Sequence, residues 1–96
     1  MEIETLLRER RGEVLRLADL HGARDVRLFG SVARGQASGK SDIDFLVKTD
    51  PVTSPWFPAG LIEDLEGLLE RKVEVVTENA LHWYIRDKVL QEAVPL

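Results

Sequence analysis

The chain has 96 residues and a formal net charge of −4, with 13 basic and 17 acidic side chains. A chain of this length forms one domain with one modest core. The acidic balance argues against direct nucleic-acid binding, and the absence of cysteine excludes disulfides and thiolate metal sites. No apolar run reaches the roughly 20 residues of a membrane span, and the acidic start lacks the features of a signal peptide. We therefore expect a single domain over residues 1–96 that acts in the cytoplasm and contacts no membrane.

The N-terminal half is expected to begin with a helix and a strand. Apolar residues at three- and four-residue spacing predict a helix over 2–21, with a kink or an early break at Gly12 as the alternative. An alternating segment predicts a strand over 25–29. Gly30-Ser31 then turns the chain, and residues 32–34 leave room for one helical turn.

The C-terminal half is expected to add two strands and two helices. In chain order these are a strand over 42–47, a helix over 61–70, a strand over 72–77 and a helix over 80–92. Prolines predict a loop over 49–60, and Asn79 is expected to cap the last helix. This order predicts an α/β (α+β) fold, with a small mixed sheet of about three strands and helices packed on one side of it.

Gly30 and Ser31 lie between a predicted strand and a predicted helix start, a place where phosphate groups bind well. Helix N-termini carry unpaired N–H groups and partial positive charge, and glycine lets the backbone approach a ligand. Arg34 falls in the first turn, where the helix dipole disfavours a cation unless an anion binds nearby. An ordinary turn capped by Ser31, with Arg34 in water, explains the same residues equally simply.

Three acidic residues form a second candidate group. Asp42 and Asp44 are two apart on a predicted strand, which places both carboxylates on one face about 7 Å apart. A divalent cation would relieve their repulsion, and Mg²⁺ prefers carboxylates together with substrate phosphates. Glu74 is the lone charge among valines on the next strand and completes the group if the two strands are neighbours. The alternative is a metal-free, half-exposed sheet on which Asp44 and Glu74 face solvent. Together with the Gly-Ser turn, the acidic group indicates phosphoryl or nucleotidyl transfer assisted by two metal ions.

The motifs resemble those of a known family. Gly30-Ser31, Arg34-Gly35 and Ser41-Asp42-Ile43-Asp44, followed by an acid on the next strand, look like the polymerase-β-type nucleotidyltransferases. The short length and the run Ala33-Arg34-Gly35 are similar to the minimal nucleotidyltransferase (MNT) subgroup. The resemblance implies that Gly30, Ser31 and Arg34 bind a nucleoside triphosphate. It also implies that Asp42, Asp44 and Glu74 are catalytic and hold two Mg²⁺ ions, although the family more often has Asp at the third position.

The resemblance also implies a partner. MNT proteins typically accompany a HEPN-domain toxin, so the expected function is an antitoxin that transfers AMP from ATP to a tyrosine of that toxin. One alternative is a catalytically weak binding module that neutralises its partner by occlusion, which the departure at Glu74 leaves open. Another is transfer to a small-molecule hydroxyl, although such relatives carry an additional helical domain.

Aromatic and histidine residues offer few further signals. Trp56-Phe57 and Trp83-Tyr84 are candidate contacts with the partner, and packing against the small core is the alternative. His21 and His82 lie in no motif, and no serine has a paired histidine at a recognisable spacing. We therefore expect His21 at the end of a helix and His82 on the surface of a helix.

Overall fold

A mixed sheet forms the centre of the protein. The computed structural model describes residues 2–36 and 42–96. Within these ranges the sheet has four strands in the order β3-β2-β1-β4. Its elements are α1 (Ile3–Leu20), β1 (Ala23–Phe29), α2 (Gly30–Ala33), β2 (Ile43–Thr49), α3 (Ala59–Leu69), β3 (Val73–Thr77), η1 (Glu78–Ala80), α4 (Trp83–Glu92) and β4 (Val94–Pro95). Strand β2 runs antiparallel to β1 and parallel to β3, so the predicted mixed sheet is confirmed.

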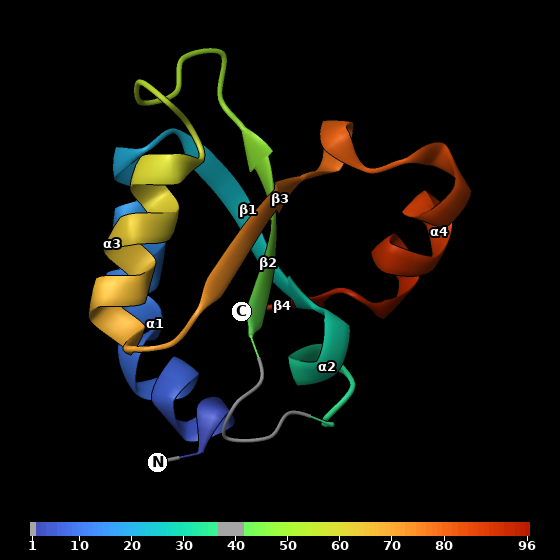
Figure 1. Cartoon of the computed structure of the whole chain (residues 1–96), viewed down its shortest axis with the longest axis horizontal. Coiled ribbons are helices and arrows are strands. Elements are labelled where there is room, and N and C mark those ends of the chain that lie inside the picture. Colours follow the sequence, from blue (N-terminus) through green and yellow to red (C-terminus); the bar gives the residue numbers. More distant parts are fainter. Residues whose placement is uncertain (1, 37–41) are drawn as a thin grey trace.

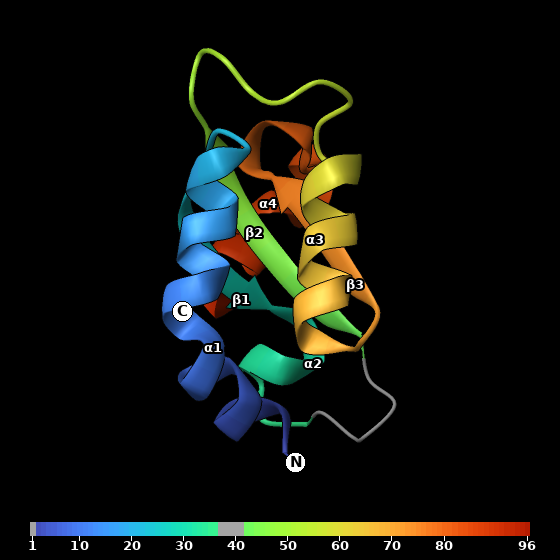
Figure 2. The ribbon, with the colours of Figure 1, turned by 90° about the vertical axis from the view of Figure 1, so that its left-hand side faces the viewer.

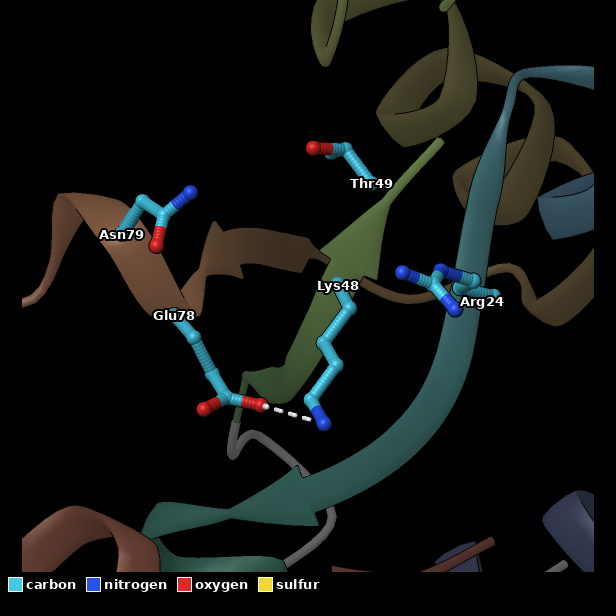
Figure 3. Close-up of a pocket in the computed structure, with 5 residues that line it drawn as sticks. All are labelled: Arg24, Lys48, Thr49, Glu78 and Asn79. Carbon is cyan, nitrogen blue, oxygen red and sulfur yellow. Dashed lines mark ion pairs between the residues drawn. The ribbon is translucent and has the colours of Figure 1, made fainter. Parts of the chain in front are cut away.

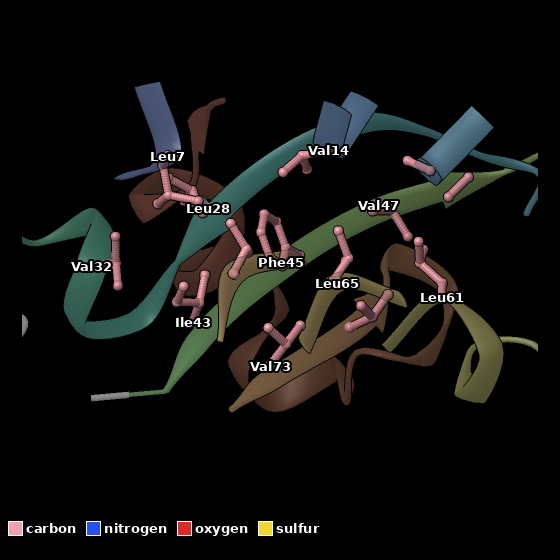
Figure 4. Close-up of a cluster of buried hydrophobic side chains, with 14 of the residues drawn as sticks. Leu7, Val14, Leu28, Val32, Ile43, Phe45, Val47, Leu61, Leu65 and Val73 are labelled. Carbon is pink, nitrogen blue, oxygen red and sulfur yellow. The ribbon is translucent and has the colours of Figure 1, made fainter. Parts of the chain in front are cut away.

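The core lies between the sheet and the helices α1 and α3, which lie side by side on one face (Figures 1 and 2). Alternate residues of β2 point toward these helices, as the two-residue period of a strand requires. Ile43, Phe45 and Val47 are all buried in this core, and Figure 4 shows them with side chains from both helices and the neighbouring strands. The other residues of β2 therefore point to the opposite face of the sheet.

Helix α4 lies on that opposite face, so the expectation that all helices pack on one side is wrong (Figure 2). The helix has no fully buried residue, and its apolar side chains do not join the core. Ion pairs connect α4 to the sheet instead. Arg86 of α4 and Arg27 of β1 both form ion pairs with the carboxylate of Glu78 in η1. The prediction relied on the spacing of apolar residues, and this spacing does not show that a helix is attached to the sheet through ion pairs.

Three local expectations also differ from the structure. Gly12 does not interrupt α1, because the buried residues Leu7 and Val14 hold the helix to the core on either side of it and outweigh the cost of about 1 kcal/mol for glycine. Asn79 lies inside η1, and the cap of α4 is His82, whose Nδ1 accepts a hydrogen bond from the backbone N–H of Tyr84 at 3.1 Å. Strand β4 was not predicted, because two residues are too few to show a pattern.

The helices of the described ranges include none that is both long and apolar enough to cross a membrane.

Candidate functional site

The junction of β1 with α2 brings Gly30 against Asp44. Phe29, the last residue of β1, pairs with Asp44 in the antiparallel ladder. Gly30 follows with a φ of +72°, and a Cβ built on it would overlap Oδ2 of Asp44. Glycine is therefore needed here both for the left-handed backbone and for the close approach. The predicted Gly-Ser turn and the predicted Asp-x-Asp strand thus meet at one point.

The parallel pairing of β2 with β3 places Glu74 beside Asp44. The two residues are partners in the strand register, so both side chains lie on the sheet face opposite the core. Burial raises the pKa of the Asp44 carboxyl, and the charges of Asp42 and Glu74 raise this pKa further, whereas Arg34 lowers it. Interactions between charges weaken steeply with distance in solvent. The charges of Asp42, Glu74 and Arg34 thus all act on the carboxyl group of Asp44.

The acidic group has the donor chemistry of a magnesium site. Carboxylate oxygens are the ligands that Mg²⁺ prefers, and a divalent cation would reverse the repulsion that raises the pKa of Asp44. Across residues 2–36 and 42–96, however, no three His, Cys, Asp or Glu side chains converge closely enough to hold one metal ion. Mg²⁺ commonly uses one or two carboxylates and completes its shell with water and substrate phosphates. The residues present fit a magnesium site of that substrate-completed kind.

Ser31 and Arg34 occupy different helical positions from those expected. Phe29 is at the N-cap position of α2, so the alternative in which Ser31 caps this helix is wrong. Arg34 is at the C-cap of the same single turn, where the dipole favours a cation. The dipole argument for a bound anion therefore does not hold, although Arg34 lies one helical turn after Gly30, which contacts Asp44. Ser41 of the motif lies outside the described residues.

A second polar cluster, which the sequence analysis missed, lies at the other end of the same sheet face. Glu78 is 14% exposed and forms ion pairs with Arg27, with Lys48 at 3.9 Å and with Arg86 at 3.7 Å. An open hollow beside it is lined by Arg24, Lys48, Thr49, Glu78 and Asn79 (Figure 3). The sequence holds no local signal for this cluster, because Arg27 on β1 and its acidic partner Glu78 are 51 residues apart.

His21 lies at the end of α1, as expected for a helix-end histidine, and joins a third polar cluster that no sequence spacing indicated. Its Nδ1 lies 2.6 Å from Oγ of Ser54, and its Nε2 lies 2.7 Å from Oδ2 of Asp64. The backbone N–H of Ser54 also donates to the carbonyl of His21 at 3.0 Å. The serine and the acid bind the opposite ring nitrogens from those of a hydrolase triad. The cluster ties the end of α1 and the middle of α3 to the proline-rich loop, at the far end of β1 from Gly30.

The aromatic pairs divide into exposed and packed residues. Trp56 is 88% exposed, and Trp83 and Tyr84 are each 78% exposed. Packing against the core, the alternative explanation, is therefore wrong for these three. It holds for Phe57, which packs against the core cluster.

Sequence comparisons agree with this geometry. Residues 8–96 match the family model of the nucleotidyltransferase domain. The protein adenylyltransferase MntA of Thermococcus cleftensis is 37% identical over 93 residues, which cover 97% of this chain and 91% of MntA. A protein of Methanocaldococcus jannaschii assigned as a protein adenylyltransferase is 38% identical over 74 residues, which cover 77% of this chain and 80% of that protein.

Solved structures give the same result. A protein assigned as a minimal nucleotidyltransferase is 48% identical, with a TM-score of 0.86, and the match covers 100% of this chain and 97% of the other. A toxin–antitoxin structure with AMP-PNP shares the fold at 21% identity and a TM-score of 0.72, covering 91% of this chain and 69% of the other. The motif resemblance is thereby confirmed: the chain belongs to the nucleotidyltransferase-domain family, in its minimal nucleotidyltransferase group, and is an enzyme of that class.

Proposed function

We propose that this protein transfers AMP from ATP to a tyrosine hydroxyl of a HEPN-domain toxin and thereby acts as its antitoxin. The observation that carries the proposal is the meeting of Gly30, Asp44 and Glu74 at the junction of three strands. The relative MntA supports the reaction, since it is a protein adenylyltransferase. The toxin–antitoxin structure with AMP-PNP supports both a nucleotide substrate and a toxin partner.

Each residue of the site has a role in this proposal. Gly30 and Ser31 bind the triphosphate, because the bare backbone at Gly30 can approach phosphate oxygens closely. Arg34 neutralises phosphate charge. Asp42, Asp44 and Glu74 would hold two Mg²⁺ ions, which would neutralise charge and acidify the acceptor hydroxyl when bound.

The transfer itself is a displacement at the α-phosphorus of ATP. The acceptor oxygen forms a bond to this phosphorus while the bond to the departing pyrophosphate breaks. Glu74 is exposed on the edge strand β3, so among the three carboxylates it is the most accessible to an incoming protein hydroxyl. We assign to Glu74 the reception of the hydroxyl proton. The reaction is expected in the cytoplasm, where ATP and Mg²⁺ are available.

Intact-mass spectrometry tests this function. The chain would be mixed with ATP, Mg²⁺ and the toxin encoded beside it, and the mass of the toxin would be followed. We expect the toxin to gain one or more AMP units, and we expect no gain with the Asp42→Asn/Asp44→Asn variant. Glu63→Gln is the matched control, because it removes an exposed carboxylate on α3, away from the site. Absence of any gain with the unmodified chain would rule out the transfer.

Neutralisation by occlusion is the second candidate. Its support is that Glu74 is exposed and does not converge with Asp42 and Asp44 into a three-ligand cluster within the described part of the chain. In this case the Asp42→Asn/Asp44→Asn variant would still bind and silence the toxin, although no AMP is transferred. Glu74→Asp would then be the variant with which to look for recovered transfer.

A further inference from the structure

Helix α4 reaches the predicted phosphate-binding turn through one ion pair. Oε2 of Glu92, in the last turn of α4, lies 3.4 Å from Nη1 of Arg34. The helices α2 and α4 are also in contact. Because Glu92 is 58 residues from Arg34 in the sequence, no local motif could have indicated this relationship.

The guanidinium of Arg34 is held on two sides. Its Nε donates to Oε1 of Gln36 at 3.2 Å, and its Nη1 donates to Glu92. Within residues 2–36 and 42–96 these are the two side-chain partners of Arg34. Arginine presents five donors in a rigid planar fork, so partners at Nε and Nη1 set the direction of the Nη2 edge. An arginine on an exposed single turn would otherwise lose considerable side-chain entropy on binding a phosphate.

We propose that Glu92 is a positioning residue that orients Arg34 for binding the phosphates of the nucleotide. This inference rests on the proposed function, in which Arg34 contacts the triphosphate. The location of Arg34 is consistent with this role, because Arg34 ends the single turn that begins at Gly30, and Gly30 lies against the Asp44 carboxylate. The side chains of Arg34 and Glu92 are 45% and 30% exposed, so the pair contributes little to folding stability. Glu92 can therefore be changed without unfolding the domain.

Calorimetric binding of AMP-PNP in the presence of Mg²⁺ tests the proposal without an acceptor. We expect Glu92→Gln to raise the Kd about three- to tenfold, in the range of coupling between contacting side chains. Glu92→Asp, which keeps the carboxylate, is expected to recover part of the loss. Asp87→Asn is the matched control, because it removes an exposed carboxylate from the same helix, and its Kd should equal that of the unmodified chain.

The Arg34→Gln background separates positioning from a structural effect. If Glu92 acts through Arg34, then Glu92→Gln will not raise the Kd further once Arg34 is replaced. An equal loss in both backgrounds, or an unchanged or lower Kd for Glu92→Gln alone, would overturn the inference. Failure of the unmodified chain to bind AMP-PNP at all would instead overturn the proposed function, and this inference with it. Thermal melting of each variant checks that the fold is retained.

Discussion

Gly30 lies directly against the carboxylate of Asp44. The preceding residue, Phe29, pairs with Asp44 in the antiparallel ladder between β1 and β2. The contact joins the turn expected to bind phosphate to the strand expected to bind metal. Gly30 needs both its left-handed φ and its lack of a side chain. The backbone at the start of α2 can therefore lie against the charged carboxylate of Asp44 on β2.

Replacement of Gly30 by Ala is predicted to reduce both stability and nucleotide binding. The left-handed backbone alone costs about 1–2 kcal/mol for a residue with a Cβ, and the new methyl group must also displace Asp44. Gly35→Ala is the matched control, because Gly35 has a φ of +71° but meets no described atom within 4 Å. Urea denaturation and AMP-PNP binding measure the two effects. Equal losses of stability and of AMP-PNP binding in the two variants would show that the contact with Asp44 contributes to neither.

Asp44→Asn is predicted to stabilise the free protein while abolishing transfer. The pKa of Asp44 is raised in the folded state, chiefly by burial and then by Asp42 and Glu74. The folded protein therefore binds this proton more tightly than the unfolded chain does. As pH rises from the ordinary value of 3.8 through the raised folded pKa, ionisation of Asp44 progressively lowers the free energy of unfolding.

Asp44→Asn should therefore raise the free energy of unfolding at neutral pH. This gain should disappear at acid pH, below the ordinary pKa of 3.8, where Asp44 is protonated in both states. Thermal melting at several pH values in EDTA measures it. For a domain of this size each kcal/mol corresponds to about 4–8 °C in Tm, so a rise of a few degrees is expected. A lower Tm for Asp44→Asn at pH 7 would contradict this account. Asp87→Asn, an exposed change, should leave the Tm nearly constant.

Glu78→Gln is predicted to destabilise the domain by about 2–3 kcal/mol. Glu78 is largely buried, and its loss would leave the cations Arg27, Lys48 and Arg86 without their shared partner. Removing one partner from a buried ion pair costs about 3–5 kcal/mol, and partial exposure reduces this. Glu13→Gln breaks an exposed pair with Arg10 and is expected to change stability by less than about 1 kcal/mol. Urea denaturation compares the two variants, and similar midpoints would contradict the prediction.

His21→Ala is predicted to lower the free energy of unfolding by about 1–3 kcal/mol, since it leaves Ser54 and Asp64 without their hydrogen-bond partner. The loss should be smaller when Asp64→Asn is already present, because the two changes remove the same bond. AMP-PNP binding is expected to persist, because this cluster lies at the opposite end of β1 from Gly30. Loss of binding in a folded His21→Ala variant would show that the cluster communicates with the site.

The sequence by itself determined the local parts of the site and most of the fold. The Asp42-Ile43-Asp44 spacing predicted two carboxylates on one strand face. The structure places Asp44 on β2 and Asp42 directly before this strand, and Gly30-Ser31 falls where a strand meets a helix. The helices and the three longer strands were also predictable, with errors only at their ends. All of these features depend on the periods of the helix and the strand, which a short stretch of chain is enough to reveal.

Only the tertiary structure decided which distant residues meet. The parallel register sets Glu74 beside Asp44, and the path of α4 across the second sheet face brings Glu92 to Arg34. The same is true of the short strand β4 and of the bonds from His21 to Ser54 and Asp64. These contacts join residues at least 30 positions apart, and each depends on how complete elements pack together. No pattern within a single helix or strand records that packing, because the same amphipathic segment can be placed on either face of a sheet.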